Sequence, residues 1–302
     1  MAFRCVSLLS DYGLQDEFVG VVHSVLKALA PGVEVVDITH GISPYDVRGG
    51  SLALARSVQY MCPGIVMALV DPGVGSERRP VAVEVGDGAS VLLGPDNGIL
   101  APAVSMVGGA TRAVVLDDPS HHLEAPGPTF DGRDVFAPVA ASLCRGTDLG
   151  ELGTEIDPGS LLPGTLPLSR VEADGIHTEV LWVDRFGNVQ LNLDPEELED
   201  HPEQVELSFS GRRTVAARAR SFSSLPVGGL GLMVDSYGLV ALVANQSSAS
   251  EETGLGPGDE VLVVPGDASA AAAEGDSPGV EIPVQLGTKR SPGGPSGQEP
   301  QP

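Results

Sequence analysis

A turn in the first third of the chain places an acidic and a basic side chain close together. Asp71 directly follows the apolar run 65–70 (IVMALV), and Arg78 lies further along the same turn. The run predicts a strand buried on both faces, so Asp71 falls at its C-terminal end, where open α/β sheets form ligand crevices. A proline and two glycines in between bend the backbone enough for Arg78 to fold back. Such a pair can hold and polarise one water molecule, with the arginine keeping the carboxylate ionised. The alternative is a surface turn with an incidental ion pair.

No standard cofactor or nucleophile motif accompanies this turn. The chain has no P-loop, no dinucleotide-binding glycine pattern, no C-x-x-C pair, no H-E-x-x-H and no G-x-S-x-G. His121 and His122 are adjacent but fall in an expected solvated loop without partner ligands, so we expect no metal site. The chemistry is therefore expected to depend on carboxylates, arginine and backbone, without a cofactor.

Composition favours a cytoplasmic enzyme. The 302 residues can bury a large core. No apolar run reaches the roughly 18 residues of a membrane span, and the N-terminal residues do not form a signal peptide, so no membrane partner is expected. Cys5, Cys62 and Cys144 are expected to be buried free thiols. A net charge of -24 with only two lysines argues against nucleic-acid binding.

The first half of the chain alternates strands and helices. The pattern predicts strands at 4–9, 33–38 and 65–70, separated by helices at 17–30 and 47–60. This order predicts right-handed crossovers and a mainly parallel sheet. Paired strands at 81–85 and 90–93, a short helix from Gly98 and a helix at 134–144 complete an expected α/β domain, residues 1–165.

The second half has a different pattern. Residues 145–172 are rich in Gly, Pro, Thr and Asp and predict a linker between domains. Short β segments follow at 175–183, 189–193, 205–209, 213–219, 239–243 and 260–264. They favour a small all-β domain over residues 171–265, either a barrel or a sandwich, and we expect it to be barrel-like. The low-complexity stretch 266–302 is expected to be disordered, with 280–286 able to add an edge strand.

Several motifs occur in a fixed order along the chain. They are Ser10-Asp11-Tyr12-Gly13, the 70–79 turn, Gly94-Pro95-Asp96-Asn97-Gly98, Thr129-Phe130-Asp131-Gly132-Arg133-Asp134, Asp184-Arg185-Phe186-Gly187-Asn188-Val189 and Asp235-Ser236-Tyr237-Gly238. Together they resemble the S-adenosyl-L-methionine (SAM) hydroxide adenosyltransferases, the SAM hydrolases related to the bacterial fluorinase and chlorinase. The resemblance extends over about residues 4–265. It implies hydrolysis of SAM to adenosine and L-methionine by in-line attack of water at ribose C5′.

The resemblance also implies a catalytic group. Asp71 and Arg78 match the water-handling pair of the hydrolases, whereas the halogenases carry a tyrosine at the Asp71 position. Asp131 stands where the hydrolases usually have a histidine. Two carboxylates beside one arginine repel each other, so one of them could have a raised pKa and accept a proton from water.

Other matches concern the ribose and the turn beside it. Asp11 matches the residue that holds the ribose hydroxyls, and Tyr45 matches an aromatic residue beside the ribose. Gly132 is expected to let the backbone approach the reacting centre. Arg133 and Asp134 are expected to lock the turn and cap the following helix.

In the second domain the matches concern adenine and methionine. Phe186 and Asn188 match residues that stack on adenine and hydrogen-bond its edge. Asp184 and Ser236 match the pair that holds the methionine ammonium and carboxylate groups. Tyr237 replaces an arginine of the fluorinase. Without the resemblance, the segment around Phe186 would be interpreted as a β-hairpin turn.

The family also implies a homotrimer with active sites between the first domain of one subunit and the second domain of its neighbour. Two alternatives remain open at this point. One is a halide-using relative, which Asp71 and Arg78 disfavour. The other is a SAM- or adenosine-binding protein without turnover, which the histidine-to-aspartate difference at Asp131 allows.

Overall fold

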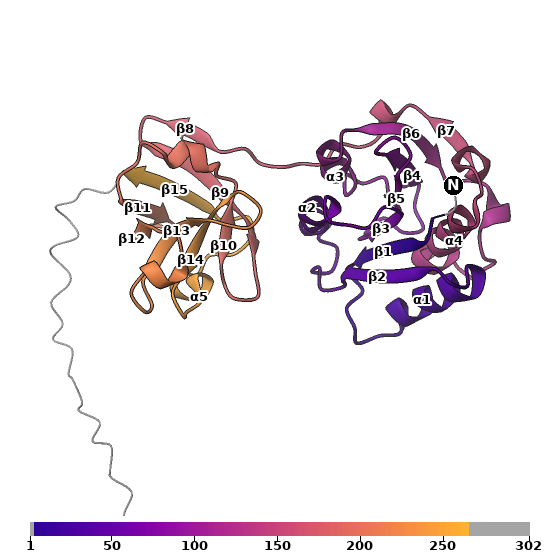
Figure 1. Ribbon diagram of the computed structural model, residues 1–302, viewed down its shortest axis with the longest axis horizontal. Coiled ribbons are helices and arrows are strands. Elements are labelled where there is room, and N and C mark those ends of the chain that lie inside the picture. Colours follow the sequence, from indigo (N-terminus) through magenta and orange to yellow (C-terminus); the bar gives the residue numbers. More distant parts are fainter. Residues whose placement is uncertain (1–2, 266–302) are drawn as a thin grey trace, which may run out of the picture. The chain divides into compact units, whose positions relative to one another are not determined.

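The computed structural model describes residues 3–265, which form two domains of different architecture (Figure 1). The first contains a seven-stranded sheet in the order β2-β1-β3-β5-β4-β6-β7. Its strands are β1 (Cys5–Ser10), β2 (Glu34–Thr39), β3 (Ile65–Leu69), β4 (Pro80–Val85), β5 (Ser90–Pro95), β6 (Ala110–Val115) and β7 (Thr154–Ile156). The strands β2, β1, β3 and β5 run parallel, and β4, β6 and β7 add antiparallel pairs at the other edge. The α/β fold and the predicted β4-β5 pair are thereby confirmed.

Helices cover both faces of this sheet. One face carries α1 (Phe18–Leu29) and α4 (Ala137–Arg145), and the other carries α2 (Val47–Val58) and α3 (Ala101–Met106) (Figure 1). Alternate side chains of β3 enter the two hydrophobic clusters, Ile65 and Met67 on one face and Val66 and Ala68 on the other. This strand is buried on both faces, as its apolar sequence predicted.

The predicted linker at 145–172 is wrong in its first half. That stretch contains the 3-10 turn η3 (Leu149–Leu152), strand β7 and the turn η4 (Pro158–Ser160). Leu149 and Leu152 are buried in the core beside α4, and β7 pairs with β6. The sequence resembled a linker here because polar residues surround the two leucines. Two of these polar residues, Asp148 and Glu151, form a capping box on η3.

The second domain is a closed β-barrel. Its strands follow the order β10-β14-β13-β12-β11-β15-β9, and β9 pairs with β10 to close the ring, while β8 extends β9 outside it. The bounds are β8 (Arg170–Glu172), β9 (Gly175–Val183), β10 (Val189–Leu191), β11 (Gln204–Phe209), β12 (Arg212–Arg218), β13 (Leu230–Val234), β14 (Val240–Ala244) and β15 (Glu260–Pro265). Short helical elements of this domain are η5 (Pro195–Leu198), η6 (Phe222–Ser224) and α5 (Ala249–Thr253), whereas η1 (Pro119–His121) belongs to the first domain. The sequence did not predict β6, β8 or β13. Gly231 interrupts the apolar run of β13, where a Cβ would lie 2.7 Å from a methyl carbon of Leu225.

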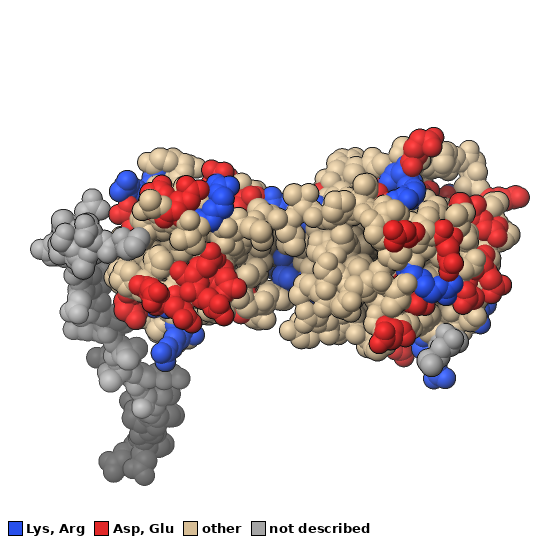
Figure 2. Space-filling view, turned by 90° about the horizontal axis from the view of Figure 1, so that it is seen from above, with Lys and Arg blue, Asp and Glu red and all other residues tan. Residues whose placement is uncertain are grey.

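Some predictions concern the surface and the chain end. Residues 266–302, including the expected edge strand at 280–286, lie outside the described residues. Within 3–265 no helix is long and apolar enough to cross a membrane. Cys5 and Cys144 are buried as expected, but Cys62 is exposed, because it lies in the turn between α2 and β3. Acidic side chains are spread over the face seen in Figure 2, consistent with the net charge of -24.

Candidate functional site

One arginine joins two carboxylates at the C-terminal end of β3. Arg78 donates from Nε to Asp71 Oδ1 over 3.0 Å and from Nη2 to Asp71 Oδ2. The same Nη2 donates to Asp131 Oδ2 over 2.7 Å. Only 8% of the Arg78 side chain is exposed. The structure therefore brings together all three residues that the sequence proposed as catalytic.

The backbone of the turn explains this convergence. Gly75 has a φ of +76°, and a Cβ there would lie 2.6 Å from the carbonyl oxygen of Pro128. Glycine therefore lets the turn pack against the segment that leads to Asp131. Asn97, from the Gly94 to Gly98 motif, donates from Nδ2 to the Val70 carbonyl over 3.0 Å. This bond fixes the end of the segment from which Asp71 projects.

Burial changes the proton affinity of Asp71. Its pKa is raised above the ordinary aspartate value, first because burial disfavours the charged form. Arg78 opposes this effect, and the negative charge of Asp131 adds to it. Desolvation outweighs the arginine in setting this direction, which agrees with the expectation that one of the two carboxylates beside Arg78 could have a raised pKa. A carboxylate with a raised pKa beside a fixed cation is suited to accept a proton from water.

One nitrogen of the arginine remains available. Arg78 Nη1 is buried and has no hydrogen-bond partner within residues 3–265. Buried guanidinium N–H groups normally have an acceptor, so an unpartnered one marks a place for a water or ligand oxygen. The site thus combines a proton acceptor with a hydrogen-bond donor.

Tyr12 is a site neighbour to which the sequence assigned no role. A Cβ at Gly132 would lie 2.4 Å from the Tyr12 hydroxyl oxygen. The Tyr12 ring packs against Phe18 and Phe130, with ring centroids 5.6 and 5.8 Å away. Burial raises the pKa of Tyr12, and nearby carboxylates including Asp71 raise it further, so the phenol stays neutral. Its place in the Ser10 to Gly13 motif was the available signal.

A π-helical turn carries the residues after Asp131. This turn, η2 (Gly132–Phe136), runs directly into α4, so the helix begins earlier than the predicted start at Asp134. Such turns are frequent at functional sites. Arg133 donates to both oxygens of Asp134 over 2.6 and 2.9 Å, which fits the expected locking of the turn. Neither helical start has a side-chain cap, so the expected capping by Asp134 is wrong.

His122 lies closer to this group than expected. Its side chain is half-buried, and its pKa is lowered by burial, while the charges of Asp118 and Asp131 oppose that shift. The expectation of a solvated histidine loop is therefore wrong for His122. Its proximity to Asp131 depends on the chain path through η1, which the sequence pattern did not reveal.

Asp11 and Tyr45 meet through the backbone. The Tyr45 amide donates to Asp11 Oδ2 over 2.9 Å. Tyr45 has a φ of 68°, in the left-handed region that residues other than glycine rarely adopt. Its side chain is exposed. The predicted ribose pair is thus held together, with the tyrosine ring free to contact a ligand.

In the barrel, Asp184 organises the turn between β9 and β10. Its Oδ1 accepts from the amides of Phe186 and Asn188 over 2.8 and 2.9 Å, and its Oδ2 accepts from Asn188 Nδ2 over 2.7 Å. Gly187 takes a left-handed φ of 82°. The Phe186 ring is 77% exposed. The turn therefore leaves the Phe186 ring exposed, while the Asn188 side chain is held against Asp184 through its amide nitrogen.

The turn between β13 and β14 repeats this pattern. Asp235 Oδ1 accepts from the amides of Tyr237 and Leu239 over 2.8 and 3.1 Å, and Gly238 has a φ of 84°. Tyr237 is 54% exposed. Asp235 was not among the predicted site residues, although the pattern Asp-x-aromatic-Gly is common to both motifs. One pocket is lined by all the predicted residues of this domain, namely Asp184, Phe186, Asn188, Ser236 and Tyr237.

The chain matches two protein-family models. The model of the SAM hydroxide adenosyltransferase N-terminal domain matches residues 6–153, and that of the C-terminal domain matches residues 178–262. An (R)-S-adenosyl-L-methionine hydrolase of Salinispora arenicola is 43% identical over 86% of this chain and 98% of its own. One of Thermus thermophilus is 39% identical over 86% of this chain and 100% of its own. A fluorinase of an Actinoplanes species is 24% identical over 64% of this chain and 73% of its own.

Solved structures share the architecture. An uncharacterized conserved protein from Thermotoga maritima superposes with a TM-score of 0.78 at 30% identity, covering 86% of this chain and 99% of that one. A conserved hypothetical protein from Thermus thermophilus has a TM-score of 0.68 at 37% identity, covering 86% of this chain and 100% of that one. The pairing of an α/β domain with a β-barrel is therefore common to these proteins.

Proposed function

This chain belongs to the SAM hydroxide adenosyltransferase family, and we propose that it is an enzyme that hydrolyses SAM to adenosine and L-methionine. Relatives named as hydrolases match at 39% to 43% identity over 86% of the chain, whereas fluorinases match at 24% to 25% over 64%. On the structural side, the proposal depends on the buried Arg78 held between Asp71 and Asp131. The names of the hydrolases specify the (R) form of the sulfonium, and we expect the same form to react here.

The reaction is an in-line displacement at ribose C5′. A bond forms between the water oxygen and C5′, and the bond between C5′ and sulfur breaks, with its electron pair moving to sulfur. The departing methionine sulfur thereby becomes neutral, so the displacement needs no acid, and we propose no metal or cofactor for this step. When the nucleophile is hydroxide-like, opposite charges disappear in the transition state, and a dry site favours that change. Positioning of the water supplies much of the remaining acceleration.

Asp71 is the proposed acceptor of the water proton. Burial raises its pKa, and Arg78 keeps the carboxylate oriented through the 3.0 Å bond from Nε. The free Nη1 of Arg78 is the proposed donor to the attacking water. Asp131 accepts a second hydrogen bond from the same Nη2 nitrogen that donates to Asp71, at the position where the family resemblance implies a histidine. Gly132 leaves the space beside this group that the Tyr12 hydroxyl enters.

The remaining residues are proposed to bind the rest of SAM. Asp11 holds the ribose hydroxyls, with the Tyr45 ring alongside. Phe186 stacks on adenine, Asn188 bonds its edge, and Tyr237 lines the same pocket. The methionine ammonium and carboxylate groups would meet Asp184 and Ser236, respectively.

We further propose a cytoplasmic homotrimer in which two subunits complete each site, with no nucleic-acid or membrane partner. The two groups of binding residues lie in different domains, and within residues 3–265 no hydrogen bond joins them. A shared site predicts complementation between two impaired variants, Asp71→Asn and Phe186→Ala, assayed at a SAM concentration below the wild-type KM. Co-assembled mixtures should be more active than either variant alone, because one interface in a mixed trimer combines two intact domains. Mixtures no more active than the separate variants would instead place the whole site within one chain.

The decisive test of the reaction uses purified protein and SAM in the (R) form at sulfur, in water enriched in oxygen-18, with and without chloride or fluoride. Mass spectrometry of the nucleosides should find labelled adenosine under all conditions. A halogenated nucleoside would assign the chain to the halogenase branch. Bound but unchanged SAM would identify a binding protein in which Asp131 has replaced a necessary group.

A further inference from the structure

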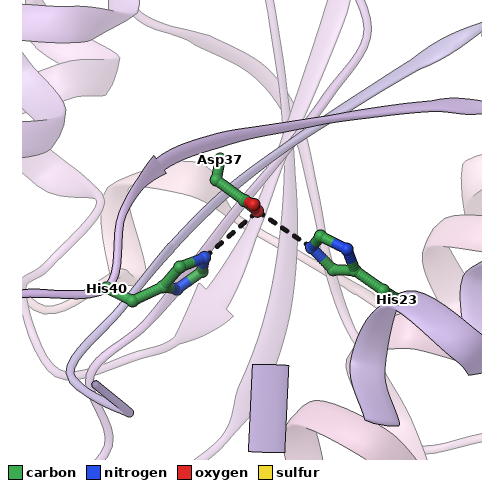
Figure 3. A group of neighbouring side chains, drawn as sticks. All are labelled: His23, Asp37 and His40. Atoms are coloured by element: carbon green, nitrogen blue, oxygen red, sulfur yellow. Dashed lines mark hydrogen bonds and ion pairs between the residues drawn. The ribbon is translucent and has the colours of Figure 1, made fainter. Parts of the chain in front are cut away.

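A second group of polar side chains lies at the edge of the sheet, outside the proposed catalytic residues. It comprises His23 on α1, Asp37 on β2 and His40 just after β2 (Figure 3). His23 Nε2 lies 2.9 Å from Asp37 Oδ1, and His40 Nε2 lies 3.1 Å from the same oxygen. Both imidazole rings therefore point their Nε2 atoms toward the same oxygen, Oδ1 of Asp37.

The buried histidine of this group has an unsatisfied nitrogen. The His40 side chain is only 5% exposed, and its Nε2 has no hydrogen-bond partner within residues 3–265, although it faces Asp37. The contact at 3.1 Å is close enough but poorly aligned for a hydrogen bond. A nitrogen lone pair in this position can bind a metal ion instead.

The other nitrogen of His40 is already fixed. His40 Nδ1 lies 2.8 Å from the hydroxyl oxygen of the buried Ser10. Histidines that bind metals usually use their second nitrogen in this way, because the second bond fixes the ring orientation and the tautomer. The buried side of the group thus has the supporting contact of a metal ligand.

The three ligand atoms all lie within 4.8 Å of one another. Nitrogen and oxygen ligands at about 2.0–2.2 Å from one tetrahedral ion are spaced by roughly 3.3 Å, so small rearrangements would suffice. Asp37 and His23 are 42% and 32% exposed, which leaves a solvent path and room for water ligands. We propose that His23, Asp37 and His40 form a binding site for a divalent transition cation of the Zn²⁺ type.

The choice of ion follows from the ligands. Two imidazoles and one carboxylate suit Zn²⁺, Co²⁺ or Ni²⁺, whereas Mg²⁺ and Ca²⁺ prefer oxygen ligands. The ion would connect α1 to the edge strand β2. It would also act on the ribose loop, because the His40 carbonyl accepts from Gly13 N over 2.9 Å, two residues after Asp11. The site is therefore proposed to stabilise structure and is separate from the displacement chemistry.

The test measures metal binding without SAM, so its outcome is independent of the hydrolase proposal. Full-length protein, with any polyhistidine tag removed and metals stripped by chelator, is titrated with Zn²⁺ by calorimetry. Co²⁺ is used in parallel, because its visible absorption reports imidazole coordination. We expect one equivalent of Zn²⁺ per chain and a higher Tm in its presence.

Variants locate the ion. His23→Gln changes a half-exposed ligand and should weaken Zn²⁺ binding by at least about 100-fold, since even residues that only orient a ligand contribute about 10- to 100-fold. Asp37→Asn should weaken it similarly, and both variants should fold because the buried His40 and Ser10 are unchanged. The matched control is His177→Gln, in a second group with Glu172 and Asp174 that has no buried member and should not affect binding.

Three results would overturn the proposal. The first is no stoichiometric Zn²⁺ binding by the wild-type protein. The second is binding that persists unchanged in both His23→Gln and Asp37→Asn. The third is binding that His177→Gln abolishes, which would assign the ion to the β8-β9 hairpin.

Discussion

The two domains hold their key aspartates in different ways. In the α/β domain, Asp71 faces a side-chain cation, and burial raises its pKa despite that partner. In the barrel, Asp184 and Asp235 accept hydrogen bonds from backbone amides of their own turns. A carboxylate facing one buried arginine can exchange a proton with water, whereas a carboxylate held by several amides mainly fixes the shape of a turn. The comparison therefore distinguishes the proposed region for chemistry from the proposed region for recognition.

Removing the buried cation should have the largest effect. Arg78→Met leaves Asp71 and Asp131 facing each other without their shared partner. We expect turnover to fall by about 100- to 1000-fold, as for loss of a preorganised donor, and unfolding free energy to fall by about 3–5 kcal/mol. Steady-state kinetics and urea denaturation measure these changes. Arg112→Met is the control, because the partners of Arg112, Asp148 and Glu155, are exposed and should contribute at most about 1 kcal/mol. Normal turnover by Arg78→Met would remove the arginine from the mechanism.

Neutralising Asp71 should reduce turnover without reducing the free energy of unfolding at neutral pH. The raised pKa means that the folded protein retains the Asp71 proton at pH values where the unfolded chain has lost it. Stability contributed by this group therefore falls as pH rises from the ordinary aspartate pKa through the raised one. Near neutral pH, Asp71→Asn should lose turnover by about 100-fold without losing stability.

The same shift predicts a pH profile for the wild-type enzyme. Turnover requires ionised Asp71, so its acidic limb should fall at a higher pH than an unperturbed aspartate would give. Rate measurements over pH, paired with urea titrations of both proteins, provide the check. A clear destabilisation of Asp71→Asn at neutral pH would show that the ion pair outweighs the burial of the charge.

A smaller effect is expected from closing the space beside the catalytic group. Gly132→Ala would place a Cβ 2.4 Å from the Tyr12 hydroxyl oxygen. We expect a loss of about 1–3 kcal/mol in unfolding free energy and a reduced turnover, both partly restored by adding Tyr12→Phe. Gly20→Ala, in α1 with nothing within 4 Å of the new Cβ, should be neutral or slightly stabilising. If Tyr12→Phe restores nothing, the contact with the hydroxyl is not the cause.

The recognition region should respond in binding rather than in stability. Phe186→Ala removes an exposed ring, and base-aromatic stacking of about 1–3 kcal/mol predicts a KM for SAM raised by about tenfold. Denaturation should be unchanged, because Asp184 continues to hold the turn through backbone amides. Phe186→Tyr keeps the stacking face and should retain a nearly normal KM. An equal loss in both variants would argue against stacking.

Sequence patterns predicted the alternating first half well, because β3 and its neighbours have strong apolar periods. They failed at η3, where Asp148 and Glu151 form a capping box, because such polar residues are also typical of a linker. The site was predictable where residues share a motif, as Asp71 and Arg78 do. The positions of Tyr12 and His122 depend on chain paths from distant elements, and burial of Asp71 depends on the whole core. The spacing of residues in the motif therefore does not reveal whether burial or Arg78 has the larger effect on the pKa of Asp71.

The π turn at Gly132–Phe136 has a consequence for how this scaffold can change. A π turn contains one residue more than an α turn, and each residue of an α-helix advances the chain by about 100° around the axis. Deleting a single codon within 132–136 could leave the buried face of α4 in place while rotating Asp131 away from Arg78. Another side chain would then face the guanidinium. The extra residue thus sets the angle around the helix axis between the buried face of α4 and Asp131, and this angle can be altered without changing the core.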